Sequence, residues 1–134
     1  MSAAGRGAPR LAVRIGARVW REEVERYDRR SEARIAVERE RPGLERGGVS
    51  IDELEACAED GPDGTRLGGL LKLYLPISEA PPSERPFAFV LATGRDEGQR
   101  YLALVAFGER HPRRGVRSVY ERAHKRLHGR YPDQ

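Results

Sequence analysis

Three apolar runs in the second half of the chain predict the central strands. These runs are LLKLYLPI at 70–77, FAFVLAT at 87–93 and YLALVAFG at 101–108. The last two are apolar at odd and even positions alike, which is typical of strands covered on both faces of a sheet. The connection between them contains Gly94 and Gly98, which favour the positive φ of a hairpin loop. We therefore expect these three strands to form the core of the domain.

Alternation of apolar and polar residues predicts two more strands nearer the N-terminus. It runs along 11–20 and again along 33–38, and we expect these two segments to pair antiparallel. Between them, 21–30 is highly charged and predicts a short exposed helix or a long turn. Residues 1–10 are rich in Gly, Ala and Arg without periodicity, which predicts a disordered tail. The remaining residues, 11–134, form a single domain in this interpretation.

Two capping boxes predict where helices begin. In such a box a Ser or Thr hydroxyl accepts from the amide three residues on, and a Glu at that position reaches back to the cap amide. Ser50 with Glu53 predicts a helix through about Asp60, and Ser118 with Glu121 predicts a C-terminal helix. Gly129 then marks the end of the C-terminal helix, because glycine readily takes the left-handed conformation.

The C-terminal helix has an apolar stripe that must be buried. At about 100° per residue, five residues share one face: Val116, Val119, Tyr120, Ala123 and Leu127. We expect this face to pack on a sheet or on another helix. The pattern as a whole predicts the α+β class, with about five mostly antiparallel strands, two or three helices, and the C-terminal helix packed on the sheet.

Composition limits the class of protein. A chain of 134 residues is long enough for one hydrophobic core without disulfides or metal. The single cysteine, Cys57, cannot form an intramolecular disulfide, and no apolar run has the length of a signal peptide. No stretch approaches the roughly 20 apolar residues of a membrane span. We therefore expect a cytoplasmic protein with no membrane partner.

Charge is segregated along the chain. The net charge of +4 arises from an arginine excess that a GC-rich genome can explain, so we discount the total. Residues 51–109 carry a net charge of −6, whereas 110–134 carry +6. A basic end of this kind can bind the phosphates of RNA or DNA. It can equally bind an acidic protein partner, or the acidic middle of a second copy of the chain.

Several kinds of site are excluded by their missing motifs. The chain has no GxxxxGK[ST], no GxGxxG after a strand and no GxSxG. His124 and His128 have the i, i+4 spacing of two metal ligands, but Lys-Arg-Leu lies between them, without the base of an HExxH motif and with two cations that oppose a divalent ion. The sequence predicts neither a metal nor a cofactor.

Every histidine of the chain lies near the C-terminus, among arginines. Histidines move protons near neutral pH and nearby cations stabilise a phosphorane-like charge, which are the ingredients of metal-free RNA cleavage. In ingredients alone, such a site resembles the compact ribonuclease toxins of bacterial toxin-antitoxin systems, and no toxin motif aligns residue by residue. The candidate catalytic residues are His111, His124, His128 and, beside the last two on the helix, Glu121.

Binding without catalysis requires fewer groups. Arg113, Arg114 and Arg117 precede the start of the C-terminal helix, where free amides and the helix dipole favour anions. Arg122 and Arg126 lie together on one flank of that helix. These five arginines are the candidate nucleic-acid-binding residues, and the leading hypothesis is a small domain that binds a polyanion, with ribonuclease-like activity as an extension. The alternative is a non-catalytic interaction module or homo-oligomer.

Overall fold

A five-stranded mixed sheet forms the centre of the molecule. The computed structural model describes residues 9–77 and 85–134. In these ranges the sheet has the order β2-β7-β6-β5-β4, and β1 and β3 form a separate two-stranded sheet. The strands are β1 (Arg10–Leu11), β2 (Val13–Arg14), β3 (Val49–Ser50), β4 (Glu55–Ala56), β5 (Leu71–Leu75), β6 (Phe87–Asp96) and β7 (Gln99–Glu109).

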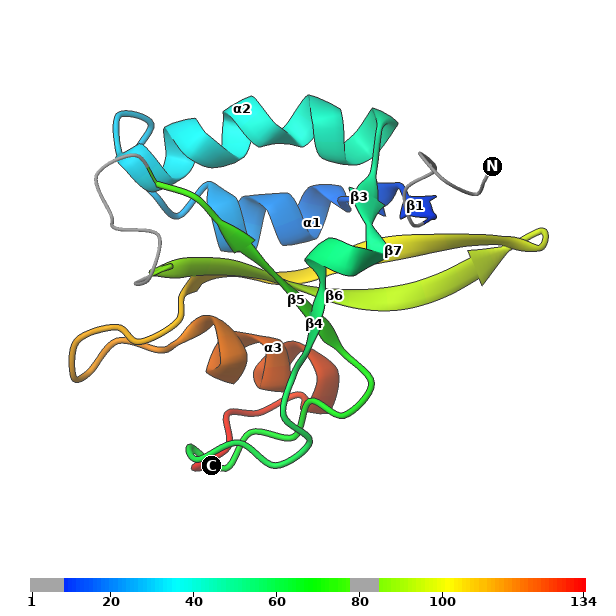
Figure 1. Cartoon of the computed structure of the whole chain (residues 1–134). Helices are drawn as coiled ribbons and strands as arrows, with labels where there is room; N and C mark the ends of the chain where they lie inside the picture. Colours follow the sequence, from blue (N-terminus) through cyan, green and yellow to red (C-terminus); the bar gives the residue numbers. More distant parts are fainter. Residues whose placement is uncertain (1–8, 78–84) are drawn as a thin grey trace.

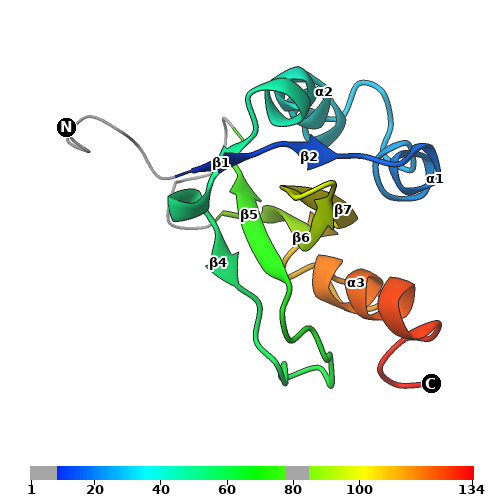
Figure 2. The ribbon, with the colours of Figure 1, turned by 90° about the vertical axis from the view of Figure 1, so that its right-hand side faces the viewer.

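Helices cover both faces of this sheet. Figure 1 shows α1 and α2 on one face and α3 on the other, and Figure 2 gives the same layers from the side. The helical segments are α1 (Ala17–Val19), continued by a π-helical turn η1 (Trp20–Val24), α2 (Glu32–Arg46), a 3-10 turn η2 (Ile51–Glu53) and α3 (Val119–His128). The predicted α+β class and the packing of the C-terminal helix on the sheet are confirmed.

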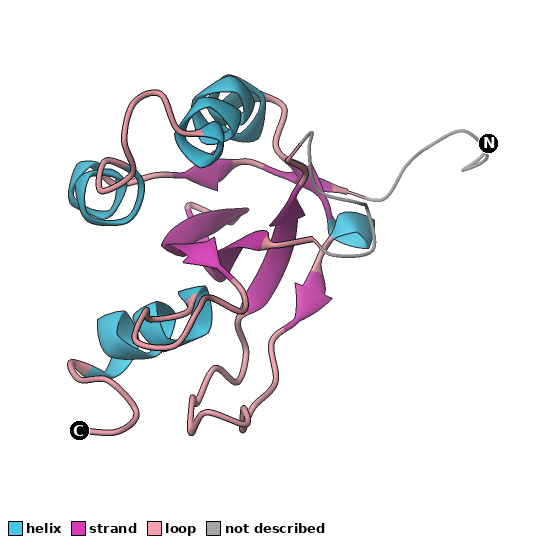
Figure 3. Cartoon of the chain, turned by 90° about the vertical axis from the view of Figure 1, so that its left-hand side faces the viewer, coloured by secondary structure: helices cyan, strands magenta, loops and turns pink. Residues whose placement is uncertain are grey.

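The sheet is mixed rather than purely antiparallel. The pairs β4·β5, β5·β6 and β6·β7 are antiparallel, but β2 runs parallel to β7. The chain reaches this parallel edge because β2 is separated from β7 in the sequence by α1, η1, α2, η2 and the strands β3 to β6, so no hairpin fixes its direction. Figure 3 shows this arrangement coloured by secondary structure.

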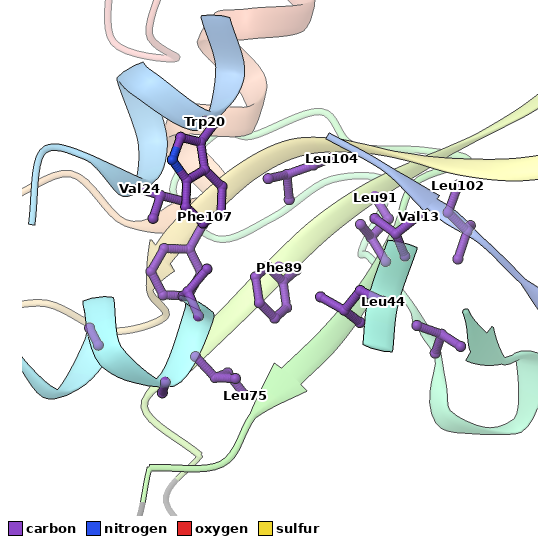
Figure 4. Close-up of a cluster of buried hydrophobic side chains, with 14 of the residues drawn as sticks. Val13, Trp20, Val24, Leu44, Leu75, Phe89, Leu91, Leu102, Leu104 and Phe107 are labelled. Atoms are coloured by element: carbon purple, nitrogen blue, oxygen red, sulfur yellow. The ribbon is translucent and has the colours of Figure 1, made fainter. Parts of the chain in front are cut away.

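Side chains of β6 and β7 point alternately into two cores. Phe89, Leu91 and Phe107 pack toward α1, η1 and α2, together with Trp20 and Val24 (Figure 4). On the opposite face, the smaller residues Ala88, Val90 and Ala106 pack against Val119 and Ala123 of α3. The prediction that these two strands are covered on both faces is therefore confirmed.

The predicted strand at 33–38 is wrong, because this segment is the start of α2. Ser31 caps the helix by accepting from the Arg34 amide, and Ala33, Val37 and Leu44 are buried on one helical face. Ile35 is 44% exposed, as a residue on the outer face of a helix would be. A six-residue alternation cannot separate a strand from a helix when the longer pattern with period 3.6 continues beyond it.

The predicted helix from Ser50 to about Asp60 is also wrong beyond its first turn. The capping box at Ser50 and Glu53 is present, but η2 ends after three residues and Leu54 is extended. The chain then forms β4, and the Cys57 amide donates to the Leu70 carbonyl at 2.9 Å. Pairing with β5 satisfies these main-chain groups in place of further helical turns.

The N-terminal strand is shorter than predicted. Only β1 and β2 are extended within 11–20, and α1 begins at Ala17, which places Trp20 in the core. Of the predicted disordered tail, residues 1–8 lie outside the described residues, and Arg10 pairs with Ser50.

Helix α3 follows its sequence signals closely. The Ser118 capping box is present, and Gly129 ends the helix with φ of 80°. Val119 and Ala123 are buried and Tyr120 is half-buried, but Val116 and Leu127, also predicted to be buried, are 37% and 45% exposed. The two ends of the stripe extend past the sheet, so only its middle is covered. No helix in the described ranges is long and apolar enough to cross a bilayer.

Candidate functional site

Arg122 and Arg126 bind a buried carboxylate within the fold. Glu23, on η1, is 2% exposed. Its oxygens accept from Arg122 Nε at 3.0 Å, Arg122 Nη2 at 2.9 Å and Arg126 Nη2 at 3.0 Å. We call Glu23, Arg122 and Arg126 the Glu23 network. Their charges are compensated inside the molecule, so these two predicted nucleic-acid-binding residues are committed to structural ion pairs.

The Glu23 network also closes one edge of the sheet. The Phe107 amide of β7 donates to Glu23 Oε1 at 3.1 Å, and the Phe107 carbonyl accepts from Arg26 Nη2 at 3.0 Å. The side chains of Glu23 and Arg26 thus satisfy the main-chain groups of β7 at Phe107, where β2 no longer pairs with β7. Open strand edges invite pairing with other chains, and side chains that satisfy the edge prevent it.

A half-buried acid, Glu22, extends the same set of ion pairs. Glu22 accepts from Arg18 Nε and from Arg126 Nη2, both at 2.9 Å. These hydrogen bonds, first from Arg18 and then from Arg126, lower the pKa of the Glu22 carboxyl to about 2. The cleft of about 440 Å³ beside these groups is lined by the paired ions together with Lys125, Gly129 and Tyr131.

Arg117 is also held by carboxylates. Its Nη1 donates to Glu121 Oε2 at 2.9 Å and to Asp133 Oδ1 at 3.0 Å, and its guanidinium lies 4.0 Å from the centre of the Tyr131 ring. The hydrogen bond from Arg117 lowers the pKa of the Asp133 carboxyl. Glu121, predicted as a catalytic partner of the histidines, is occupied by Arg117 and by the Ser118 amide.

His124 and His128, on α3, contact the main chain of Arg66 in the loop between β4 and β5. The Arg66 amide donates to His124 Nδ1 at 3.0 Å, and the Arg66 carbonyl lies 3.0 Å from His128 Nε2. The two rings are 4.4 Å apart between centroids. Burial, followed by the charges of His128, Arg66 and Arg130, lowers the pKa of His124. A neutral ring with an accepting Nδ1 fits this role, so in this structure both rings bind the main chain of Arg66.

Other predicted residues lie on exposed surface between β7 and α3. His111, Arg113 and Arg114 are exposed, and the described ranges contain no carboxylate within 4.0 Å of their side chains. His111 lines a pocket of about 310 Å³ that also contains Lys72, Arg110 and Tyr120. The structure therefore separates the three histidines: His111 lies in this pocket, and the other two lie on the loop contact.

Basic and aromatic side chains meet at that pocket. Arg110 Nε donates to the Tyr120 hydroxyl at 2.9 Å, and the Arg110 guanidinium lies 4.5 Å from the centre of the Tyr74 ring. The Lys72 ammonium lies 5.8 Å from the Tyr74 ring centre and 5.5 Å from that of Tyr120. The Arg85 guanidinium covers Tyr74 at 5.0 Å. We call this set the Lys72 patch, with the members Lys72, Tyr74, Arg85, Arg110, His111 and Tyr120.

The Lys72 patch lacks the internal compensation of the Glu23 network. In the described part of the chain, neither Lys72 nor Arg110 has a carboxylate within 4.0 Å. The members come from β5, the segment before β6, the end of β7 and α3, so sequence reasoning missed all of them except His111. The one local signal was Lys72 and Tyr74 at alternate positions among leucines, which places a cation and an aromatic ring on one face of a strand.

No metal centre is present among the residues that the structure describes, where no group of three or more His, Cys, Asp or Glu side chains could hold an ion. Cys57 is buried, and this burial raises the pKa of its thiol. The nucleophilic thiolate is therefore disfavoured. No family model matches the chain, and no curated protein or solved structure is significantly similar to it.

Proposed function

We propose that the protein binds the phosphate backbone of a nucleic acid, preferentially single-stranded RNA, through the Lys72 patch. The observation that supports the proposal is the convergence of Lys72 and Arg110, without carboxylate partners in the described ranges, around two tyrosines. Arg113 and Arg114 continue this surface into the exposed loop before α3. The proposed site shares His111, Arg113 and Arg114 with the site predicted from sequence.

Physical chemistry favours this surface over the rest of the basic C-terminus. A cation that already donates to a buried carboxylate cannot turn to a phosphate without leaving that carboxylate unpaired, which costs about 3–5 kcal/mol. Arg122 and Arg126 carry this cost because Glu23 is buried. Lys72 and Arg110 would give up ring contacts, and Arg110 also its hydrogen bonds to the Tyr120 hydroxyl and the Arg85 carbonyl, but neither would leave a buried carboxylate unpaired. The counterions released from the nucleic acid then contribute to affinity.

The tyrosines favour a flexible single strand. Bases in a duplex are stacked and hidden, whereas bases of a single strand can stack on exposed aromatic side chains. Tyr74 and Tyr120 are both half-buried and held by Arg110, so their rings keep a fixed place beside the cations. A fixed ring loses little conformational entropy when a base stacks on it.

The test is a binding titration with a fluorescent, mixed-sequence RNA strand at two salt concentrations. We expect Lys72→Gln with Arg110→Gln to weaken binding at least about tenfold, with a smaller salt dependence. The matched control is Arg95→Gln with Arg100→Gln, which removes the same charge from the opposed pair near the tip of the β6–β7 hairpin. If both variants lose RNA affinity equally, the loss follows from net charge alone, and this result would contradict the proposed site.

A second candidate function, cleavage of the bound RNA, rests on His111. Its exposed imidazole lines the same pocket as Lys72, Arg110 and the Tyr120 ring. In cleavage without metal, the 2′-hydroxyl of the RNA attacks the neighbouring phosphorus and the O5′ leaves with a proton. An imidazole can transfer these protons while the cations stabilise the charge on phosphorus.

Cleavage is tested with the same RNA in the presence of EDTA. We expect products with His111 intact and their loss in His111→Ala, with RNA affinity retained. His124→Ala and His128→Ala serve as comparisons, because these rings contact main chain and lie outside the pocket lining. Binding without any cleavage would leave the binding proposal in place and reject the catalytic one.

A further inference from the structure

The outer edge of β5 is only partly covered. Strand β4 pairs with it at Glu55↔Lys72 and Ala56↔Leu71, and β5 continues to Leu75. In the ranges that the structure describes, no strand pairs with β5 on this side beyond Lys72. β5 therefore has an open stretch at its C-terminal end.

The direction of the main-chain groups follows from one hydrogen bond. The Leu70 carbonyl accepts from the Cys57 amide, so it faces β4. Main-chain groups alternate sides along a strand, and Lys72 and Tyr74 therefore present theirs to the same side. Lys72 is opposite Glu55, but no strand residue is opposite Tyr74. Among the described residues, no strand pairs with the Tyr74 N–H and C=O on this side.

The capping box of η2 creates this opening. Continuation of β4 toward its N-terminus would bring Leu54 and Glu53 alongside β5. Instead the Leu54 amide donates back to the Ile51 carbonyl, and the Ser50 amide donates to Glu53 Oε2 at 3.1 Å. Both interactions keep the segment helical and away from the edge.

Two hollows border the open edge. They have volumes of about 470 and 410 Å³, and Leu73, Tyr74, Leu75 and Pro76 line both of them. Together they leave space along the strand for another extended chain. Strands of a sheet are about 4.8 Å apart, so an added strand would lie within this space.

The two hollows differ in chemistry. The first has an acidic rim made by the exposed residues Asp52, Glu53 and Glu55, with one cation, Arg85. The second has an apolar wall from Leu44, Val49 and Phe89, and its two cations, Arg10 and Arg39, are balanced by two acids, Glu40 and Glu53. An added strand would direct alternate side chains to the two sides.

We propose that the open edge of β5 binds an extended, basic segment of a partner protein by strand addition at Tyr74. Its positive side chains would face Asp52, Glu53 and Glu55, and its apolar side chains would face the wall of the second hollow. The Tyr74 N–H and C=O supply the main-chain hydrogen bonds. Specificity comes from alternate side chains, as in other cases of strand addition.

A second copy of this chain fits the edge poorly. Two-fold pairing of β5 with itself would bring the same surface from both copies together. The acidic rim would then face an identical acidic rim, and like charges across an interface are unfavourable. Pro76 further limits self-pairing because it lacks an N–H at the end of each edge.

The experiment uses three blocked eight-residue peptides and the full chain labelled with ¹⁵N. One peptide alternates Lys with Val, one alternates Glu with Val, and one is the Lys-Val peptide methylated at every main-chain nitrogen. We expect the Lys-Val peptide to bind at least about tenfold more tightly than the Glu-Val peptide. Binding should shift the Tyr74 amide signal and slow its hydrogen exchange.

The methylated peptide separates strand addition from simple charge attraction. It keeps every positive charge but has no main-chain N–H, so it cannot form a ladder. Binding as tight as that of the Lys-Val peptide, or an unchanged Tyr74 amide, would overturn the proposal. Failure of the Lys-Val peptide to bind at all would do the same.

A charge reversal of the rim supplies an internal control. In Asp52→Lys with Glu55→Lys, the preference should reverse, with the Glu-Val peptide bound at least about tenfold more tightly. Both residues are exposed, and Glu53 keeps its capping role, so the fold is retained. Arg113→Gln with Arg114→Gln should leave peptide binding unchanged, because neither residue lines the two hollows, which distinguishes this edge from the proposed RNA surface. An unchanged preference in the reversed rim would contradict the assignment.

Discussion

The Glu23 network and the Lys72 patch are both basic, but their charges are used differently. In the Glu23 network, a carboxylate that is 2% exposed binds Arg122 and Arg126, and the pair lies against β7. In the Lys72 patch, Lys72 and Arg110 lie beside tyrosine rings without a described carboxylate within 4.0 Å, and Arg85 pairs with Glu55 at 3.8 Å, where both side chains are exposed. The difference teaches that the position of the counter-charge, more than the number of arginines, decides which basic residues are available to a ligand.

The largest expected effect is on the Glu23 network. Glu23→Ala should lower the free energy of unfolding by about 3–5 kcal/mol, because it leaves two guanidinium groups and the Phe107 amide without their buried acceptor. Urea denaturation followed by circular dichroism measures this change. Glu22→Ala, at a carboxylate that is 39% exposed, is the control and should cost about 1 kcal/mol or less. Equal costs would contradict the structural role of Glu23.

The next effect concerns the Lys72 patch and affects binding more than stability. Lys72→Gln with Arg110→Gln should reduce RNA affinity at least about tenfold, or about 1.4 kcal/mol. Ring contacts and a hydrogen bond at the surface are lost as well, so a small drop in the melting temperature is expected. Anisotropy titrations measure the affinity. A large loss of stability with unchanged RNA affinity would show that this patch, like the Glu23 network, stabilises the fold and does not bind RNA.

A smaller effect is the dependence of stability on pH, which we expect from His124. The folded pKa of His124 is lowered from its ordinary value of about 6.5. Below that value the unfolded chain binds the proton more readily, so stability present at pH 7 and above should fall as pH drops below about 6.5 toward the folded pKa. The hydrogen bond from Arg66 to His124 lies next to the pocket that His111 lines, because Thr65 and Leu67, the neighbours of Arg66, line that pocket too.

This pH dependence is measured by urea denaturation between pH 8 and pH 5. In His124→Asn the slope in this range should decrease, because the group whose pKa differs between the folded and unfolded states is gone. His111→Asn, at an exposed ring outside the Arg66 contact, is the control. A slope that depends on His111 and not on His124 would refute the assignment.

The smallest effect is expected from the exposed loop. Arg113→Gln with Arg114→Gln should weaken RNA binding a few fold and reduce the magnitude of the salt slope by about 1, because each phosphate contact to a single strand contributes about 0.7. Titrations at several salt concentrations measure the slope. Stability should be unchanged, since the described ranges contain no ion pair of either side chain. An unchanged slope would remove the loop from the binding surface.

Much of the fold was predictable from local patterns. The three apolar runs became β5, β6 and β7, and the Ser118 capping box with Gly129 set the limits of α3. The segment 33–38 was mispredicted because a short alternation also fits the inner and outer faces of a helix. The Ser50 capping box correctly predicted a helical start, but the length of the helix depended on competition from β5.

The candidate site was only partly predictable. His111, Arg113 and Arg114 lie on exposed surface as a binding site requires, whereas Arg117, Arg122 and Arg126 are held by carboxylates. The Arg122 partner is 99 residues away in the sequence. No local pattern identifies a partner at that distance.

The sequence by itself determined the local structure: which segments are apolar on both faces, where capping side chains begin a helix, and where a glycine ends one. These properties depend on neighbouring residues in the chain and on the periods of the helix and the strand. Only the tertiary structure decided which cations are compensated, which rings lie beside them, and which strand edge stays open. Glu23 reaches Arg122, and Arg110 reaches Tyr74, only after the sheet has brought distant segments together, because electrostatic and main-chain contacts depend on distance in space.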